Sequence, residues 1–100
     1  MAPLRIALVT EDRFPDGTPD DGRLRDALAR MGVEASFRIW SDPKVDWADF
    51  DLAVMRSTWD YFLRVDEFRA WLDRMEPLGV LANDVQTVRW NMDKRYLADL

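Results

Sequence analysis

The sequence is most informative over the stretch Leu52-Ala53-Val54-Met55-Arg56-Ser57-Thr58-Trp59-Asp60-Tyr61. Its first four residues are apolar and predict a short buried strand over residues 52–55. A cation, two hydroxyls, a carboxylate and two aromatic rings follow directly. Because ligands of open α/β sheets bind just beyond the carboxyl ends of the strands, this position favours a binding site. The predicted site residues are Arg56, Ser57, Thr58, Trp59, Asp60 and Tyr61.

A structural interpretation of the same cluster stays open. Aromatic side chains bury large apolar areas, so Trp59 and Tyr61 would cover the core while Arg56 pairs with Asp60. The two interpretations differ in what Arg56→Ala does. Loss of a binding residue impairs ligand use and leaves the melting temperature nearly unchanged, whereas loss of a structural residue mainly unfolds the protein.

The composition is that of one small globular domain. The chain has 100 residues, of which 48% are hydrophobic and 33% charged. Its net charge of −5 and the mixing of arginines with aspartates argue against a nucleic-acid partner. The absence of cysteine and histidine excludes disulfides, the usual zinc ligand sets and histidine-dependent nucleophiles. With no signal-peptide pattern and no apolar run of about 20 residues, we expect a cytoplasmic protein without membrane contact.

Local signals predict where the helices lie. Thr18 is a capping residue, Pro19 suits the first helical position, and two aspartates follow at the positive end of the helix. Gly32 is a typical stop. Apolar residues recur at helical spacing over 65–75 and predict a helix with one buried face. The expected helices cover residues 19–31, 65–75, 84–90 and 92–100.

Apolar runs and alternation predict strands at residues 5–10, 33–40, 52–55 and 80–82. The resulting order β-α-β-β-α-β-α-α is typical of an α/β fold with a mainly parallel sheet and helices on both faces. We expect a small three-layer, Rossmann-like domain. The connection between the second and third strands is the weakest point, because residues 45–50 have room for only one helical turn.

Two phosphate-binding motifs are absent: neither the Gly-x-Gly-x-x-Gly turn nor the Gly-x-x-x-x-Gly-Lys-Ser/Thr loop occurs. The acidic pair Glu11-Asp12 follows the first strand, as in receiver domains of response regulators. Such domains need a phosphate-accepting aspartate at the end of the third strand, where this chain has Arg56 and Ser57. We therefore interpret Glu11 and Asp12 as solvated loop residues. The aspartates at positions 20 and 21 are interpreted as helix-start charges.

Two segments together resemble a known family. They are Trp47-Ala48-Asp49-Phe50-Asp51-Leu52-Ala53-Val54-Met55-Arg56-Ser57-Thr58-Trp59-Asp60-Tyr61 and Val88-Arg89-Trp90-Asn91-Met92-Asp93-Lys94-Arg95-Tyr96-Leu97. The chain resembles the N-terminal, pre-ATP-grasp domain of ATP-grasp ligases, in the glutathione-synthetase-like branch that includes the D-cycloserine ligase. The Arg-Ser-Thr-Trp-Asp-Tyr string is fairly specific to this branch. The Asp-Lys pair is weaker, because it also occurs in D-alanine–D-alanine ligases.

The resemblance implies a ligase that joins a carboxylate to an amine or similar nucleophile through an acyl-phosphate made from ATP and magnesium. It implies the flavodoxin-like strand order 2-1-3-4, with residues 1–90 as the substrate-side domain and residues 91–100 as the start of a helix leading to the ATP-grasp domains. A lysine matching Lys94 reaches the ATP phosphates in relatives, while the phosphate-covering loop and the magnesium ligands belong to later domains. We therefore expect this chain alone to be non-catalytic and to bind ATP poorly.

The residues suit these implied roles. Arg56 has the fork geometry that holds a substrate carboxylate, and Lys94 has the compact charge that suits phosphate, although most lysines in helices are simply exposed. The implied partners are the downstream domains and a small-molecule substrate, with a homodimer possible. Apolar residues near the end are expected to face the next domain or to form a short packed helix: Trp90, Met92, Tyr96, Leu97 and Leu100. The rival function is a stand-alone, receiver-like binding module.

Overall fold

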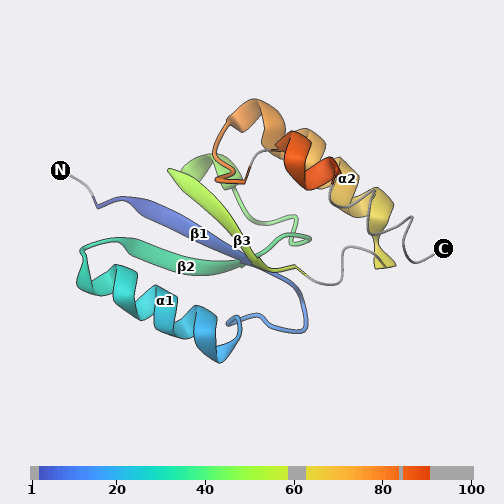
Figure 1. Ribbon diagram of the computed structural model, residues 1–100. Helices are drawn as coiled ribbons and strands as arrows, with labels where there is room; N and C mark the ends of the chain where they lie inside the picture. Colours follow the sequence, from blue (N-terminus) through green and yellow to red (C-terminus); the bar gives the residue numbers. More distant parts are fainter. Residues whose placement is uncertain (1–2, 59–62, 84, 91–100) are drawn as a thin grey trace.

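The computed structural model describes residues 3–58, 63–83 and 85–90. Three parallel strands, β1 (Arg5–Thr10), β2 (Glu34–Ile39) and β3 (Leu52–Ser57), form one sheet in the order β2-β1-β3. Helices α1 (Pro19–Arg30) and α2 (Val65–Met75) lie on opposite faces of it (Figure 1). The predicted α/β class, the three layers and the parallel sheet are therefore confirmed.

The start of α1 follows the predicted capping signals. Thr18 is the N-cap, with its Oγ1 accepting the Asp21 backbone N–H at 3.3 Å. In return, the Thr18 N–H donates to Asp21 Oδ2 at 3.0 Å, which completes a capping box. Gly17, just before the cap, has φ of +69°, and a Cβ there would lie 2.9 Å from Phe37 Cζ. Only glycine fits this turn without strain, and the turn brings the beginning of α1 back to the sheet.

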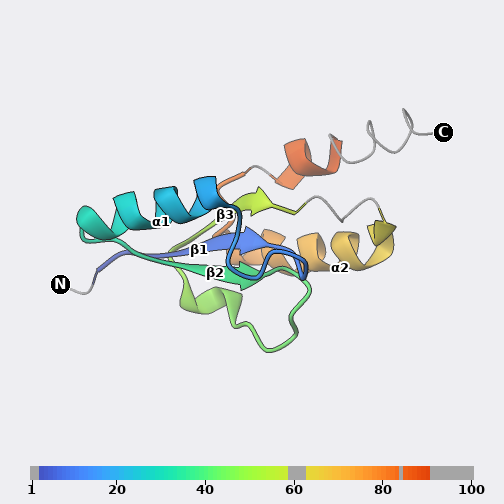
Figure 2. The ribbon, with the colours of Figure 1, turned by 90° about the horizontal axis from the view of Figure 1, so that it is seen from below.

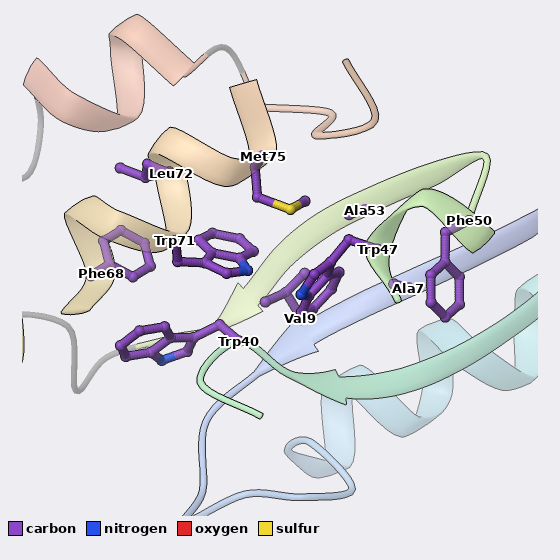
Figure 3. Packing of buried hydrophobic residues seen from close by; sticks show 10 residues of the cluster. All are labelled: Ala7, Val9, Trp40, Trp47, Phe50, Ala53, Phe68, Trp71, Leu72 and Met75. Carbon is purple, nitrogen blue, oxygen red and sulfur yellow. The ribbon is translucent and has the colours of Figure 1, made fainter. Parts of the chain in front are cut away.

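The larger core lies between the sheet and α2 (Figure 3). The helix buries one face, as its apolar spacing predicts, with Phe68, Trp71, Leu72 and Met75 fully buried. Trp40 meets Phe68 edge-on, with 5.1 Å between the ring centroids. Aromatic side chains contribute large buried areas and favour such edge-on contacts. The cluster comprises Ala7, Val9, Trp40, Trp47, Phe50, Ala53, Phe68, Trp71, Leu72 and Met75.

The connection from β2 to β3 contains the single helical turn for which residues 45–50 had room. It is the 3-10 turn η1 (Trp47–Asp49), capped by Asp46, whose side chain accepts the Ala48 N–H at 3.2 Å. Trp47 from this turn joins the core beneath α2. The crossover can therefore be short and still return the chain to a parallel strand.

The order 2-1-3 of the predicted 2-1-3-4 is confirmed, whereas the predicted fourth strand at residues 80–82 is reduced to one residue pair beside β3. Leu81 forms an isolated parallel bridge with Ala53, after the 3-10 turn η3 (Glu76–Leu78). The Ala53 N–H donates to Val80 O, and the Ala82 N–H donates to Ala53 O, both at 2.7 Å. At the next position along β3, the side chain of Asn83 accepts the Met55 N–H at 3.3 Å. A side chain thus replaces the backbone carbonyl that would have lengthened the strand.

A further helical stretch covers residues 85–90, within the predicted helix 84–90. It is tied to α2, because Arg89 Nη2 lies 2.5 Å from Asp73 Oδ1 and 3.6 Å from Glu76 Oε2. The predicted helix 92–100, with Met92, Lys94, Tyr96, Leu97 and Leu100, lies outside the described residues. Among the residues that are described, no helix has the length and apolar character of a membrane span.

Candidate functional site

The carboxyl ends of the three strands meet at one edge of the sheet, where the arrowheads point in Figure 2. Thr10, the last residue of β1, is in register with Ile39 of β2 and Ser57 of β3. The residues that follow these strand ends are therefore neighbours in space. This is the edge at which α/β sheets bind their ligands.

β3 is longer than predicted, and it is irregular at the candidate site. It runs to Ser57 rather than ending at Met55. Val9 pairs with Met55, but the next residue of β1, Thr10, pairs with Ser57, so Arg56 is an extra residue in β3. Such bulges bend a strand and re-aim a side chain, and they are common beside functional sites. β3 extends beyond its apolar run because pairing to the apolar β1 continues through the polar residues that follow.

Arg56 is held by a residue that the sequence did not connect with it. Its Nε donates to Asp21 Oδ1 at 2.9 Å. The Asp21 side chain is 4% exposed and that of Arg56 is 39% exposed. Asp21 is a helix-start charge, as predicted, but it also binds across to β3. The predicted partner in the structural interpretation, Asp60, lies outside the described residues.

The geometry leaves one end of the Arg56 fork available. Within residues 3–58, 63–83 and 85–90, neither terminal nitrogen of its guanidinium makes a hydrogen bond. A carboxylate can be bound by two parallel N–H···O bonds from such a fork. The chemistry that this arrangement supports is recognition of a planar anion at the edge of the sheet.

The interpretation of Glu11 as a solvated loop residue is wrong. Its side chain is fully buried rather than solvated, and it accepts a bond from Arg13 Nε at 2.5 Å. The residue continues directly from buried Thr10, whose Oγ1 donates to Phe14 O at 2.7 Å and closes the loop over it. Asp12, by contrast, is exposed as expected. Burial follows from the closed loop, which residue type alone does not indicate.

Arg64, which the sequence did not single out, joins the loops at this edge. Its Nη1 donates to Asp12 Oδ2 at 3.1 Å and to Ser41 Oγ at 3.3 Å. Its guanidinium carbon lies 4.9 Å from the centroid of the Trp40 ring. The loops after β1 and β2 are thereby fastened to the beginning of α2. A cation directly before a helix, where the helix dipole disfavours it, was the available sequence signal.

The predicted site residues divide into two groups. Arg56, Ser57 and nearly buried Thr58 lie at the carboxyl edge of the sheet. The others lie outside the described residues and stay predictions: Trp59, Asp60, Tyr61 and Lys94. Among the residues described, no group of three acidic, histidine or cysteine side chains is placed to hold a metal ion.

A hollow of about 500 Å³ lies apart from Arg56, along the free edge of β2. Its lining includes Arg5, Arg38 and Phe50, and the centroid of the Phe50 ring lies 5.2 Å from the guanidinium carbon of Arg5 and 5.4 Å from that of Arg38. A hydrogen bond from Arg5 to Asp49, and the Asp49 charge, raise the pKa of Arg5. Arg38 Nη1 donates to the Phe37 carbonyl at 2.8 Å. Arg5 and Arg38 already have partners, so their guanidinium groups are less available to a ligand than that of Arg56.

The fold and the site define a class: an α/β domain with a three-stranded parallel sheet and, at its carboxyl edge, an arginine paired with a buried aspartate. Residues 6–83 match the family described as the N-terminal domain of D-cycloserine synthetase DcsG. The chain belongs to this family, which confirms the resemblance to the branch that includes the D-cycloserine ligase.

Two comparisons give the extent of the similarity. The cycloserine biosynthesis protein DcsG of Streptomyces lavendulae is 38% identical over 95 residues, which are 95% of this chain and 32% of the relative. The crystal structure of D-cycloserine synthetase DcsG matches with a TM-score of 0.79 at 37% identity, covering 95% of this chain and 32% of that one. The chain thus spans about a third of the length of the proteins it matches.

Proposed function

We propose that this chain is the substrate-side domain of an ATP-dependent ligase that joins a carboxylate to an amine or similar nucleophile. In this proposal residues 1–90 form the domain, and residues 91–100 begin a helix that leads to ATP-grasp domains. Membership of the DcsG N-terminal family supports the assignment. The observation that carries it is the fork of Arg56, which is presented at the carboxyl edge with its Nε held by Asp21.

The proposed role of Arg56 is to hold a carboxylate of the substrate through its two terminal nitrogens. Ser57, Thr58, Trp59, Asp60 and Tyr61 would complete the substrate pocket. ATP, when bound with magnesium by the later domains, would activate a carboxylate as an acyl-phosphate, and Lys94 would contact its phosphates. The names of the relatives, a cycloserine biosynthesis protein and a D-cycloserine synthetase, suggest that the proposed ligase acts in the synthesis of a cycloserine-like product.

Arg56→Lys in the full-length protein tests the proposal. A lysine keeps a positive charge near Asp21 but lacks the fork, so the KM for the carboxylate substrate should rise. Hydrogen bonds to charged groups contribute about 1.5–3 kcal/mol, which corresponds to a change of roughly 10- to 100-fold. Arg23→Lys is the matched control, because Arg23 is exposed and its partner among the described residues is the exposed Asp20. An unchanged KM in Arg56→Lys would refute the proposed role.

Arg56→Ala is expected to change both stability and substrate binding, whereas the sequence alone suggested that it would separate the two. It removes the Arg56 guanidinium from the buried carboxylate of Asp21, so we expect a loss of stability as well as a higher KM. The cost should be smaller than the ~3–5 kcal/mol of fully buried pairs, because the Arg56 side chain is 39% exposed to water. The melting temperature therefore does not separate binding from structure for this substitution.

The coding sequence beyond codon 100 separates the ligase from the rival binding module. A downstream glycine-rich loop and late acidic metal ligands support the ligase. A stop codon at that point favours a stand-alone module and overturns the proposal.

A further inference from the structure

We propose that Asp21 is a positioning residue that sets how Arg56 receives the substrate, an inference that rests on the function proposed above. Arg56 and Asp21 are 35 residues apart in sequence, on β3 and α1. Figure 2 shows the beginning of α1 beside the end of β3. Their contact joins the two elements at the candidate site.

The two oxygens of Asp21 have different roles. Oδ2 accepts the Thr18 N–H at 3.0 Å and belongs to the capping box, which fixes the orientation of the carboxylate. Oδ1 accepts Arg56 Nε at 2.9 Å. A carboxylate locked by the backbone at one oxygen is a rigid support for a side chain held at the other. The first turn of α1 therefore fixes the position of the Arg56 guanidinium through Asp21.

The burial of Asp21 determines which of the two side chains a substrate can contact. The Asp21 side chain is 4% exposed, so a substrate cannot reach it directly, whereas the Arg56 side chain is 39% exposed. A guanidinium binds carboxylates either through Nε and one terminal nitrogen or through both terminal nitrogens. Asp21 occupies Nε, and only the end-on mode is left for the substrate. The bulge at Arg56 contributes by directing this side chain out of the regular alternation of β3.

Asp21 acts through Arg56 in this arrangement, and its effect should vanish when Arg56 is gone. The experiment is a double-mutant cycle in the full-length protein with Asp21→Asn, Arg56→Lys and the double variant. Asp21→Asn alone should raise the KM for the carboxylate substrate about 5- to 30-fold with kcat changed less than about twofold, since a lost charged pair alters orientation rather than chemistry. In the Arg56→Lys background the same substitution should change KM less than about twofold.

Thr18→Ala is the matched control for helix capping. It removes the other half of the capping box without touching Arg56, so it should lower the melting temperature and leave KM unchanged. If Thr18→Ala raises KM equally, or if Asp21→Asn acts equally in both backgrounds, Asp21 is only a capping residue and the inference fails alone. If Arg56→Lys itself leaves KM unchanged, the proposed function fails and takes this inference with it.

Discussion

The indole rings of Trp47 and Trp71 meet at 73°, with 5.4 Å between their centroids. This contact joins the turn that precedes β3 to the middle of α2. Both side chains are buried, and the indole N–H of Trp71 has no hydrogen-bond partner among the described residues. Within the described part of the chain, the core therefore combines a large buried aromatic contact with an unsatisfied donor.

Substitutions of Trp71 should separate two effects on the free energy of unfolding: the buried aromatic contact raises it, and the unpaired indole N–H lowers it. Trp71→Ala should lower the free energy of unfolding by about 3–5 kcal/mol, because a large cavity remains. Trp71→Phe should cost less than about 2 kcal/mol, because removal of the unpaired N–H offsets part of the lost contact. Urea unfolding of the chain measures both, with exposed Trp90→Phe as the control. A loss well above about 2 kcal/mol for Trp71→Phe would contradict a cost of the unpaired N–H.

Asn83 should protect one backbone amide of β3. Asn83→Ala removes the acceptor of the Met55 N–H, so hydrogen exchange at the Met55 amide should accelerate by about 5- to 10-fold, as expected for a loss of about 1 kcal/mol. The Ala53 amide is the internal control, because it donates to the backbone carbonyl of Val80. Asn83→Asp retains an acceptor and should keep the slow exchange. Unchanged exchange at Met55 in Asn83→Ala would contradict the contact.

Arg64 should stabilise the site loops in a salt-dependent way. Arg64→Met removes its bonds to Asp12 and Ser41 and its contact with the Trp40 ring, and should cost about 1–2 kcal/mol at low salt. At 1 M salt the difference from the parent chain should shrink, since exposed ion pairs are screened. Arg23→Met, at an exposed pair on α1, should cost less than about 0.5 kcal/mol. A difference that does not depend on salt would assign the effect to packing.

Calorimetry with Mg-ATP tests the proposal that the later domains of the ligase, rather than this chain, form most of the nucleotide site. The 100-residue chain should show no micromolar affinity, because Lys94 alone supplies little of a nucleotide site and the described residues hold no cluster of metal ligands. The full-length protein serves as the positive control. Micromolar binding by the chain alone would place a complete nucleotide site within these residues and overturn the proposed role.

The last predicted feature is association through the end of the chain. Trp90 is 63% exposed, and large exposed apolar surfaces commonly mark an interface. Trp90→Glu should weaken any concentration-dependent dimerisation of the chain in sedimentation velocity runs, whereas Leu4→Glu, at another exposed apolar side chain, should not. Equal effects of the two substitutions would indicate nonspecific association.

Elements that depend on local signals were predictable from the sequence. β1 and α2 have the expected bounds, and the turn before α1 is capped as its Thr-Pro-Asp-Asp pattern indicates. Elements that depend on a partner were not. The end of β3 was placed two residues early, because pairing to β1 carries the strand through Arg56 and Ser57. The fourth strand was overestimated, because Asn83 supplies a side-chain acceptor where a backbone carbonyl was expected.

In the candidate site, too, some features depend on local sequence signals and others on distant parts of the chain. The sequence by itself determined that Arg56, Ser57 and Thr58 come at the carboxyl end of a strand, because apolar runs and capping patterns are short-range and readable along the chain. Only the tertiary structure decided which charges are buried and which face a ligand. The pairing of Asp21 with Arg56, and the burial of Glu11, depend on elements that other parts of the chain bring together. A charged side chain can be buried only where the folded chain places an opposite charge beside it. The spacing of residues along one segment does not show which distant residue will be that partner.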